Sequence, residues 1–268
     1  RSGNHTPGSL AGRRASRLHS RIRTMRIVGL TGGIACGKSA VSTAAASWGL
    51  RVIDMDEIAR RVVCPGLPAY TDIVAAFGDG ALLPSGELNR TEVGRIAFSD
   101  REKRRALNAA THRPMLMQLL AELAAALFGG EAAVLIDAPL LFETSLHWLC
   151  CTTLVVAVAE ATQLERLRAR DGFSAEEAEK RIAAQMPLAE KCARADAVID
   201  NEGTRDELAA RAATILDAAG AIAGGLPWWA RLPRTRVLLL DPLLWLLLAA
   251  LRLCGVEPLP HAGEATKS

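Results

Sequence analysis

The sequence predicts an α/β fold in which five parallel strands form a sheet with helices on both faces. Short apolar runs alternate with longer amphipathic segments from residue 25 to about residue 225. The runs at 132–136 and 152–157 are almost wholly apolar, as expected for central parallel strands that are buried on both faces. A glycine-rich segment joins the first apolar run to an amphipathic one, which is typical of strand–loop–helix units.

The elements are expected in the following order. The first strand is predicted over 26–30 and the first helix over 38–48, where Gly49 ends the helix as a C-cap. The other four strands are predicted at 51–53, 132–136, 152–157 and 197–199. A mostly helical insertion over 57–128 separates the second and third strands, and a charged helical pair over 162–193 separates the last two. The folded domain is therefore expected to extend from 25 to 225.

Composition narrows the class of protein. Half of the 268 residues are hydrophobic and 23% are charged, which excludes general disorder. Aromatic residues make up only 4%, which argues against a stacking platform for single-stranded nucleic acid. Six arginines and no acid lie in residues 1–24, so the net charge of +3 becomes −3 for the rest of the chain. No nucleic-acid partner is expected for such a body.

The six cysteines show no Cys-x-x-Cys spacing and no histidines at metal-ligand spacing. We therefore expect free thiols in a reducing compartment and no structural zinc. An intracellular protein is predicted, either mitochondrial or membrane-associated, or otherwise cytoplasmic. The cysteines are Cys36, Cys64, Cys150, Cys151, Cys192 and Cys254.

The two ends of the chain differ from the middle. Residues 1–24 are rich in Arg and Ser, so they are either a mitochondrial transit segment or a disordered extension. The tail at 226–268 contains an apolar stretch at 237–256, long enough as a helix to cross about 30 Å of bilayer. Trp228 and Trp229 beside three arginines resemble an interfacial belt, which favours a membrane anchor. The alternative is a hydrophobic helix packed on the body or on another subunit.

The segment from Gly32 to Ser39 predicts a nucleotide site. It reads Gly32-Gly33-Ile34-Ala35-Cys36-Gly37-Lys38-Ser39 and matches G-x-x-x-x-G-K-[ST] between a strand and a helix. In such a P-loop, backbone N–H groups cradle phosphate at a helix N-terminus. Lys38 is expected to reach the β- and γ-phosphates of ATP, and the Ser39 hydroxyl to ligate Mg²⁺. Contacts to the nucleotide are expected from Gly32 through Ala40.

Cys36 is an unusual residue in that loop. A thiol exposed at a helix N-terminus would have a lowered pKa. Cys36 is then either a passive small residue or an oxidation and alkylation site that ATP would protect.

Two carboxylates follow the second strand. Asp54 and Asp56 lie just beyond its carboxyl end, on the edge where open α/β sheets bind ligands. Phosphoryl transfer to a hydroxyl needs a carboxylate to orient the nucleophile and accept its proton. An acid here can also cap the helix that follows. With two acids present, one can cap and the other can act.

Residues from about 25 to 201 resemble the dephospho-coenzyme A kinase family. The resemblance depends on many short matches in order along the chain. They include Ile27 to Ile34, Val52 to Arg60, Pro65 to Tyr70, Phe77-Gly78, Thr111-His112, Pro139 to Glu143, Gln163 to Leu167, Arg170-Asp171, Gln185 and Ala195 to Asn201. The family transfers the γ-phosphate of ATP to the ribose 3′-hydroxyl of dephospho-CoA, the last step of coenzyme A synthesis.

The resemblance implies a P-loop NTPase-type core, a CoA-binding insertion at 57–128 and a lid at 162–193. It also implies roles for single residues. Asp56 would be the catalytic base, and Asp54, Arg60 and His112 would line the acceptor side. Arg166 and Arg170 would close on the triphosphate, with Lys38 and Arg170 assisting the transfer. Asn201 would meet the adenine. Asp137 would either contact a Mg²⁺-bound water or cap a helix.

The chain departs from the family pattern in three places. Ala35-Cys36 replaces the usual Gly-Ser, Ala40 replaces a second hydroxyl residue, and Arg113 separates His112 from the usual proline. Proline restricts the residue before it, so the path at His112 is expected to differ. Two alternatives to the kinase named above are another small-molecule kinase and a catalytically weak, membrane-attached nucleotide-binding scaffold.

Overall fold

A computed structural model describes residues 25–221 and confirms a five-stranded parallel sheet in the order β2-β3-β1-β4-β5. The strands are β1 (Arg26–Gly32), β2 (Arg51–Asp54), β3 (Ala133–Asp137), β4 (Thr152–Ala157) and β5 (Ala197–Asp200). Three strands extend one residue further than predicted and end on an aspartate. The predicted basic extension at 1–24 and the tail at 226–268, with its apolar stretch, lie outside the described residues. No helix within residues 25–221 is long and apolar enough to cross a membrane.

β1 lies at the centre of the sheet. It pairs with β3 from Arg26 opposite Ala133 and with β4 from Val28 opposite Thr152. Gly29 is needed in this strand, because a Cβ there would lie 2.7 Å from Cys150 Sγ. The sheet is therefore packed closely on the face where Cys150 and Leu141 lie against β1.

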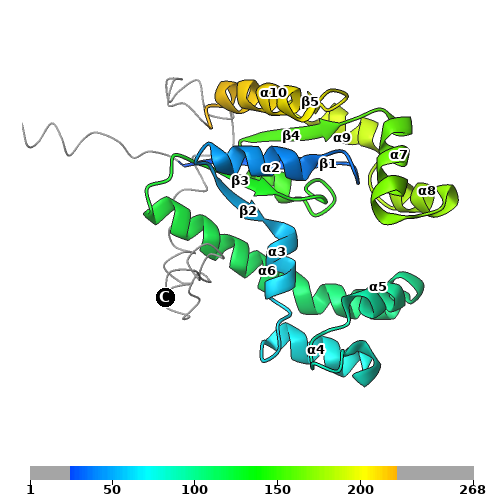
Figure 1. Cartoon of the computed structure of the whole chain (residues 1–268). Coiled ribbons are helices and arrows are strands. Elements are labelled where there is room, and N and C mark those ends of the chain that lie inside the picture. Colours follow the sequence, from blue (N-terminus) through cyan, green and yellow to red (C-terminus); the bar gives the residue numbers. More distant parts are fainter. Residues whose placement is uncertain (1–24, 222–268) are drawn as a thin grey trace, which may run out of the picture.

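Each face of the sheet is covered by helices (Figure 1). α2 (Lys38–Ser47) and α10 (Arg205–Ala218) cover one face and share a core with β1 and β4. Gly49 (φ 82°) follows α2 in the left-handed conformation, as its predicted role at the helix end requires. α6 (Arg101–Phe128) packs its C-terminal half on the other face. This arrangement leaves the carboxyl ends of the strands open for a site.

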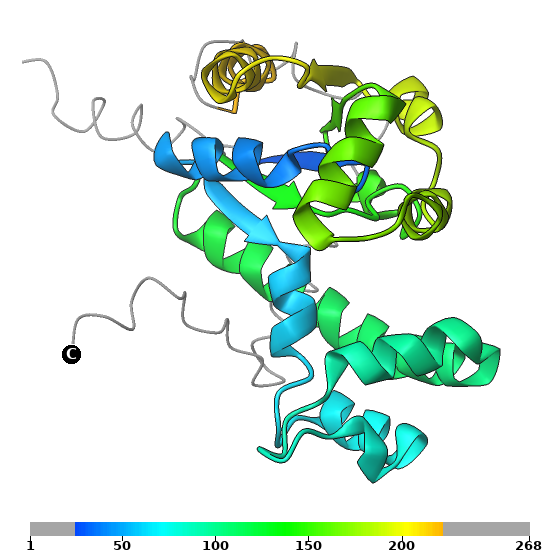
Figure 2. The same ribbon diagram turned by 45° about the vertical axis from the view of Figure 1, so that its right-hand side comes forward.

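The predicted helical insertion is confirmed between β2 and β3. It consists of α3 (Met55–Arg61), α4 (Pro68–Phe77), the short η1 (Asp79–Ala81), α5 (Arg90–Ser99) and α6. α4 and α5 lie away from the sheet against the N-terminal half of α6 (Figures 1 and 2). Buried Glu122 of α6 binds Arg51 of β2 at 2.8 Å and lies 3.6 Å from Arg61 of α3. These charges tie the insertion to the sheet.

His112 lies within a long helix that also contains Pro114. α6 continues without a break through Pro114. Proline has no N–H, so the carbonyl of Ala110 loses its usual helix partner, a defect that costs about 3 kcal/mol in a helix interior. His112 therefore lies on an exposed helical face rather than at a helix end.

A pair of helices was predicted at 162–193, but the structure has three helices in this region. They are α7 (Glu160–Asp171), α8 (Ala175–Ala183) and α9 (Leu188–Arg194). Gly172 (φ 72°) ends α7, and the Ser174 capping box starts α8. Pro187 then separates α8 from α9. The second break was missed although Pro187, which cannot continue a helix, marks it in the sequence.

Lys191 holds α9 against the sheet. Its side chain is fully buried, and Nζ donates to the Pro139 carbonyl at 2.7 Å and pairs with Glu143 at 3.0 Å. The Thr31 hydroxyl donates to the same Pro139 carbonyl at 3.0 Å. One carbonyl after β3 therefore joins α9 to the end of β1.

We expect Lys191→Ala to lower the free energy of unfolding by about 3 kcal/mol, because it leaves Glu143 and a carbonyl without their cation. Lys180→Ala is the matched control, since its pair with Glu176 is exposed and should contribute less than about 1 kcal/mol. Urea unfolding measures both. Equal losses in the two variants would contradict the anchoring role of Lys191.

Candidate active site

The loop between β1 and α2 has the conformation that phosphate binding requires. Ala35 (φ 60°) and Gly37 (φ 87°) are both left-handed, and residues in this alternation direct successive N–H groups to one side. Gly37 has no alternative, because a Cβ there would lie 2.2 Å from Asn201 Nδ2. Ala35 adopts a conformation that costs a non-glycine residue about 1–2 kcal/mol. The usual glycine of the family pattern therefore has a physical reason at this position.

The loop lines a cavity of about 400 Å³ at the carboxyl ends of the strands. The other residues that line the cavity come from α3, the loop after β3 and the α7–α9 segment. The cavity is lined by residues 32–39 and by Asp56, Pro139, Arg166, Arg170 and Gln185. The structure thus brings together the predicted loop, the predicted base and both predicted arginines.

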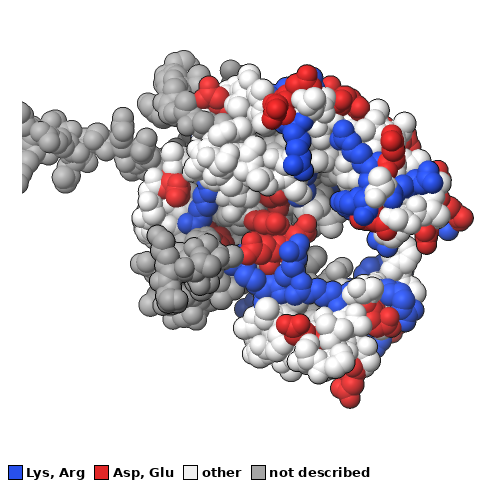
Figure 3. All heavy atoms as spheres, viewed as in Figure 1, with Lys and Arg blue, Asp and Glu red and all other residues white. Residues whose placement is uncertain are grey.

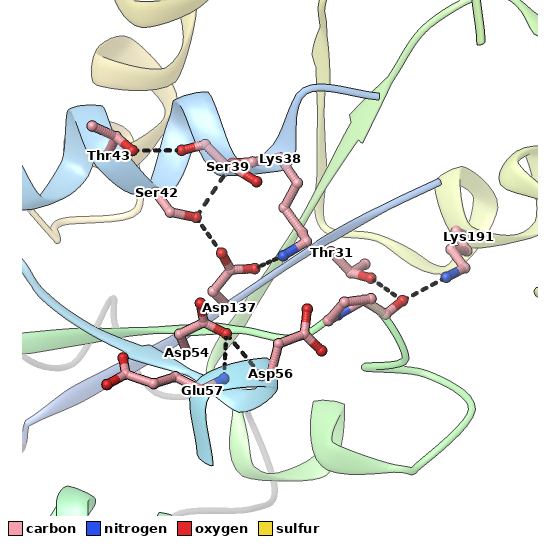
Figure 4. Close-up of polar contacts among 11 residues, drawn as sticks. Thr31, Lys38, Ser39, Ser42, Thr43, Asp54, Asp56, Glu57, Asp137 and Lys191 are labelled. Carbon is pink, nitrogen blue, oxygen red and sulfur yellow. Dashed lines mark hydrogen bonds and ion pairs between the residues drawn. The ribbon is translucent and has the colours of Figure 1, made fainter. Parts of the chain in front are cut away.

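Lys38, which lines this cavity, forms an ion pair with Asp137 (Figure 4). The Ser42 hydroxyl donates to the second oxygen of Asp137, so the carboxylate is held from two sides. Asp137 is buried at the end of β3, and its side chain caps no helix. The capping alternative is therefore wrong, whereas the contact to a Mg²⁺-bound water stays a prediction.

The sequence left open which of Asp54 and Asp56 caps the helix and which is available to act, and the structure distinguishes the two. Asp54 Oδ1 accepts from the N–H groups of Asp56 at 2.8 Å and Glu57 at 3.2 Å, so Asp54 is the N-cap of α3. Asp56 stands in the first turn and faces the cavity. Figure 4 shows the two carboxylates on separate sides of the start of α3.

The surroundings of Asp56 raise its pKa. Burial by the surrounding protein is the main cause, and the negative charges of Asp54 and Asp137 add to it. Lys38 and, more weakly, Arg60 act in the opposite direction. The side chain remains open to solvent through the cavity, so a substrate can reach it. A carboxylate with a raised pKa is suited to accept a proton.

Asn201 supports the loop directly. Its buried Nδ2 donates to the Cys36 carbonyl at 2.8 Å, and the backbone carbonyl of Asn201 accepts from Arg166 Nη2 at 3.1 Å. The side chain is thereby committed to the loop and does not line the cavity. The predicted contact of Asn201 with adenine is not among these bonds and stays a prediction.

Cys36 does not have the exposed, reactive thiol that one alternative expected. Its side chain is fully buried with Val41, Ala45 and Leu208 in the core beneath the loop. Burial raises the pKa of its thiol to about 11. The passive reading is confirmed, and Cys36 cannot report whether the cavity is occupied. The five cysteines among the described residues are free thiols, as predicted.

Two of the predicted residues, Arg60 and His112, do not line the cavity. Arg60 is exposed on α3, and its carbonyl accepts from Arg90 at 3.3 Å. His112 is exposed on α6. Figure 3 shows a hollow between the sheet and the insertion, bordered on both sides by Lys and Arg. Arg170 is exposed and forms a bidentate pair with Asp171 at 2.8 Å.

Metal ligands are sparse near the loop. No cluster of three His, Cys, Asp or Glu side chains occurs within residues 25–221. Mg²⁺ needs no such cluster when it binds one or two protein oxygens together with phosphates and waters. The Ser39 hydroxyl at the cavity and the carboxylate of Asp137 have this chemistry.

Sequence reasoning gave no role to Gln163, Gln185 and Ser42. Gln163 Nε2 donates to the Ile34 carbonyl at 2.9 Å, and Gln185 Oε1 accepts from the Ile34 N–H at 3.2 Å. Both glutamines lie in the α7–α9 segment, more than a hundred residues from the loop along the chain. Only the helical spacing that puts Ser42 one turn after Lys38 could have indicated one of them.

A comparison with protein families matches residues 26–207 to the family described as dephospho-CoA kinase. Among curated proteins, the chain is 52% identical over 180 residues to the dephospho-CoA kinase of Geobacillus kaustophilus, covering 67% of this chain and 90% of that one. It is 46% identical over 183 residues to the dephospho-CoA kinase of Oryza sativa subsp. japonica, covering 68% and 80%.

Two solved structures are also similar to this chain. A crystal structure from Thermus thermophilus is similar with a TM-score of 0.65 and 34% identity, covering 72% of this chain and 97% of the other. The dephospho-CoA kinase from Campylobacter jejuni has a TM-score of 0.56 and 26% identity, covering 72% and 96%.

A thiol reagent at neutral pH is expected to modify exposed Cys64 well before buried Cys36 and half-buried Cys150, because burial raises the pKa of both of these thiols. Peptide mass mapping after brief alkylation measures the order, and urea-unfolded protein is the control in which all sites react. Rapid modification of Cys36 in the folded protein would contradict its burial.

Proposed function

The chain belongs to the dephospho-CoA kinase family, and from this premise we propose how its own residues carry out the reaction. The chain is an ATP-dependent phosphotransferase that acts on dephospho-CoA and forms coenzyme A. The γ-phosphate of ATP passes to the ribose 3′-hydroxyl. One observation carries the assignment of residues: Asp56 is the carboxylate that faces the cavity of the phosphate loop while its neighbour Asp54 caps the helix.

Asp56 acts as the general base. It accepts the proton of the 3′-hydroxyl as that oxygen attacks the γ-phosphate. Its raised pKa supports this role, because a more basic carboxylate takes the proton more readily. Asp54 acts as a positioning residue, since its cap fixes the first turn of α3 that carries Asp56.

Cations stabilise the transferring group. Lys38 exchanges its contact with Asp137 for the β- and γ-phosphates, while Arg166 and Arg170 approach from α7. The α7–α9 segment then has the role of a lid. The insertion holds the acceptor, and exposed Arg60 of α3 and His112 of α6 contact it.

Mg²⁺ would be held by Ser39 and, through water, by Asp137, and when bound it neutralises charge on the phosphates. Asp137 keeps the same place whether Lys38 pairs with it or not, because Ser42 also holds it. Attachment to a membrane through the tail at 226–268 remains a prediction.

Asp56→Asn is expected to lower turnover at least about 10²-fold, because the amide cannot accept the proton, while ATP binding is retained. A coupled ADP-release assay with dephospho-CoA measures turnover, and calorimetry measures ATP binding. Asp72→Asn, an exposed aspartate on α4, is the matched control and should behave as wild type. Unchanged turnover in Asp56→Asn would contradict the assignment. A wild-type chain without turnover would favour the scaffold alternative.

The pH dependence gives a second test. Activity needs ionised Asp56, so it is present above the pKa of Asp56 and is lost as pH falls through that pKa. Because this pKa is raised, the loss occurs at a higher pH than for an ordinary aspartate. Asp54→Asn preserves the helix cap but removes one negative charge, so the acidic limb of kcat/KM should move to lower pH. A limb that does not move would show that Asp54 has no influence on the base.

A further inference from the structure

Two glutamines bind the backbone of Ile34 in the phosphate loop, one at its carbonyl and one at its N–H. Gln163 of α7 donates to its carbonyl at 2.9 Å, and Gln185, between α8 and α9, accepts from its N–H at 3.2 Å. Gln163 is only 3% exposed, and a Cβ on Gly33 would lie 2.5 Å from its Nε2. The α7–α9 segment is therefore joined to the loop through both backbone groups of one residue, Ile34.

The two hydrogen bonds differ in whether they use a backbone group that could bind phosphate. The Ile34 carbonyl has no part in binding an anion, so the bond from Gln163 competes with nothing. The Ile34 N–H belongs to the loop whose donors face the cavity, and Gln185 lines that cavity. A phosphate oxygen that took this N–H would occupy the place of the Gln185 oxygen, because one N–H makes one good hydrogen bond.

Replacement of the Gln185 oxygen by a phosphate oxygen at the Ile34 N–H is energetically favourable. A hydrogen bond to an anionic oxygen is roughly twice as strong as one to a neutral amide oxygen. The side chain of Gln185 also has a way to move, since it stands between the end of α8 at Ala183 and the start of α9 at Leu188. α9 itself is anchored by buried Lys191, so the displacement is confined to the side of α8.

We propose that Gln185 is a positioning residue that a phosphate of ATP displaces from the Ile34 N–H, which couples nucleotide binding to the position of α8. This inference rests on the proposed function, because it takes a nucleoside triphosphate as the ligand of the loop. Gln163 keeps the Ile34 carbonyl fixed during the exchange, so the loop retains its shape while α8 is released.

Two substitutions of Gln185 separate displacement from direct contact. Gln185→Leu removes the competing oxygen and should tighten the Kd for ATP by roughly 2- to 10-fold, the worth of one hydrogen bond. Gln185→Glu keeps the size but places an anion at the Ile34 N–H, and should weaken ATP binding by at least about 10-fold. Ala184→Glu is the control, because it adds the same charge one residue away, at an exposed position.

Calorimetry with ATP measures the affinities in the full-length protein, and thermal unfolding with and without ATP shows that each variant is folded. ATP should raise the Tm of Gln185→Leu by more than it raises the Tm of wild type. Weaker binding in Gln185→Leu would show that Gln185 contacts the nucleotide and would overturn the proposal. So would equal weakening in Gln185→Glu and Ala184→Glu, or a lowered Tm of Gln185→Leu with an unchanged response to ATP.

The same measurements distinguish this proposal from the proposed function. A wild-type chain that binds ATP but does not phosphorylate dephospho-CoA contradicts the proposed function, and the order of the four affinities still decides the exchange. A wild-type chain that does not bind ATP overturns the exchange directly.

Discussion

The site depends on one local constraint, the left-handed conformation of two residues in the phosphate loop. Ala35 and Gly37 turn the backbone so that its N–H groups face one cavity. Little within the loop itself keeps this shape. Asn201, which follows edge strand β5, donates to the Cys36 carbonyl, and two glutamines bind the carbonyl and the N–H of Ile34. The strained loop is stable because distant parts of the chain converge on its carbonyls and amides.

A second constraint is the balance of charge beyond the strand ends. Strands β2 and β3 end on Asp54 and Asp137, and Asp56 follows, so negative charge gathers beside a site for an anion. Each carboxylate except Asp56 has a fixed partner: Asp54 binds backbone N–H groups, and Asp137 binds Lys38 and Ser42. The acid without such a partner is the one whose pKa is raised. Asp54 and Asp137 are therefore bound to structural partners, whereas Asp56 is left available to accept a proton.

The sequence predicted the sheet, its strands and the insertion, because apolar runs and helical periods are local signals. It also placed Asp56 and the loop correctly, since both follow strand ends directly. It could not predict the burial of Cys36, which depends on α10 packing beneath the loop. The roles of Gln163, Gln185 and Lys191 were missed for the same reason. Their partners are loop and strand-end atoms far away in the chain, and only the three-dimensional structure brings them together.

The position of β1 in the sheet also has a consequence for synthesis on the ribosome. β1 is made first, yet its neighbours are β3 and β4, and Arg26 pairs with Ala133. At the usual rate of translation, about 100 residues take roughly 5–20 s to emerge. An apolar strand with two unpaired edges must remain without its partners for that time. The unpaired edges of β1 are therefore exposed to aggregation until β3 and β4 have been made.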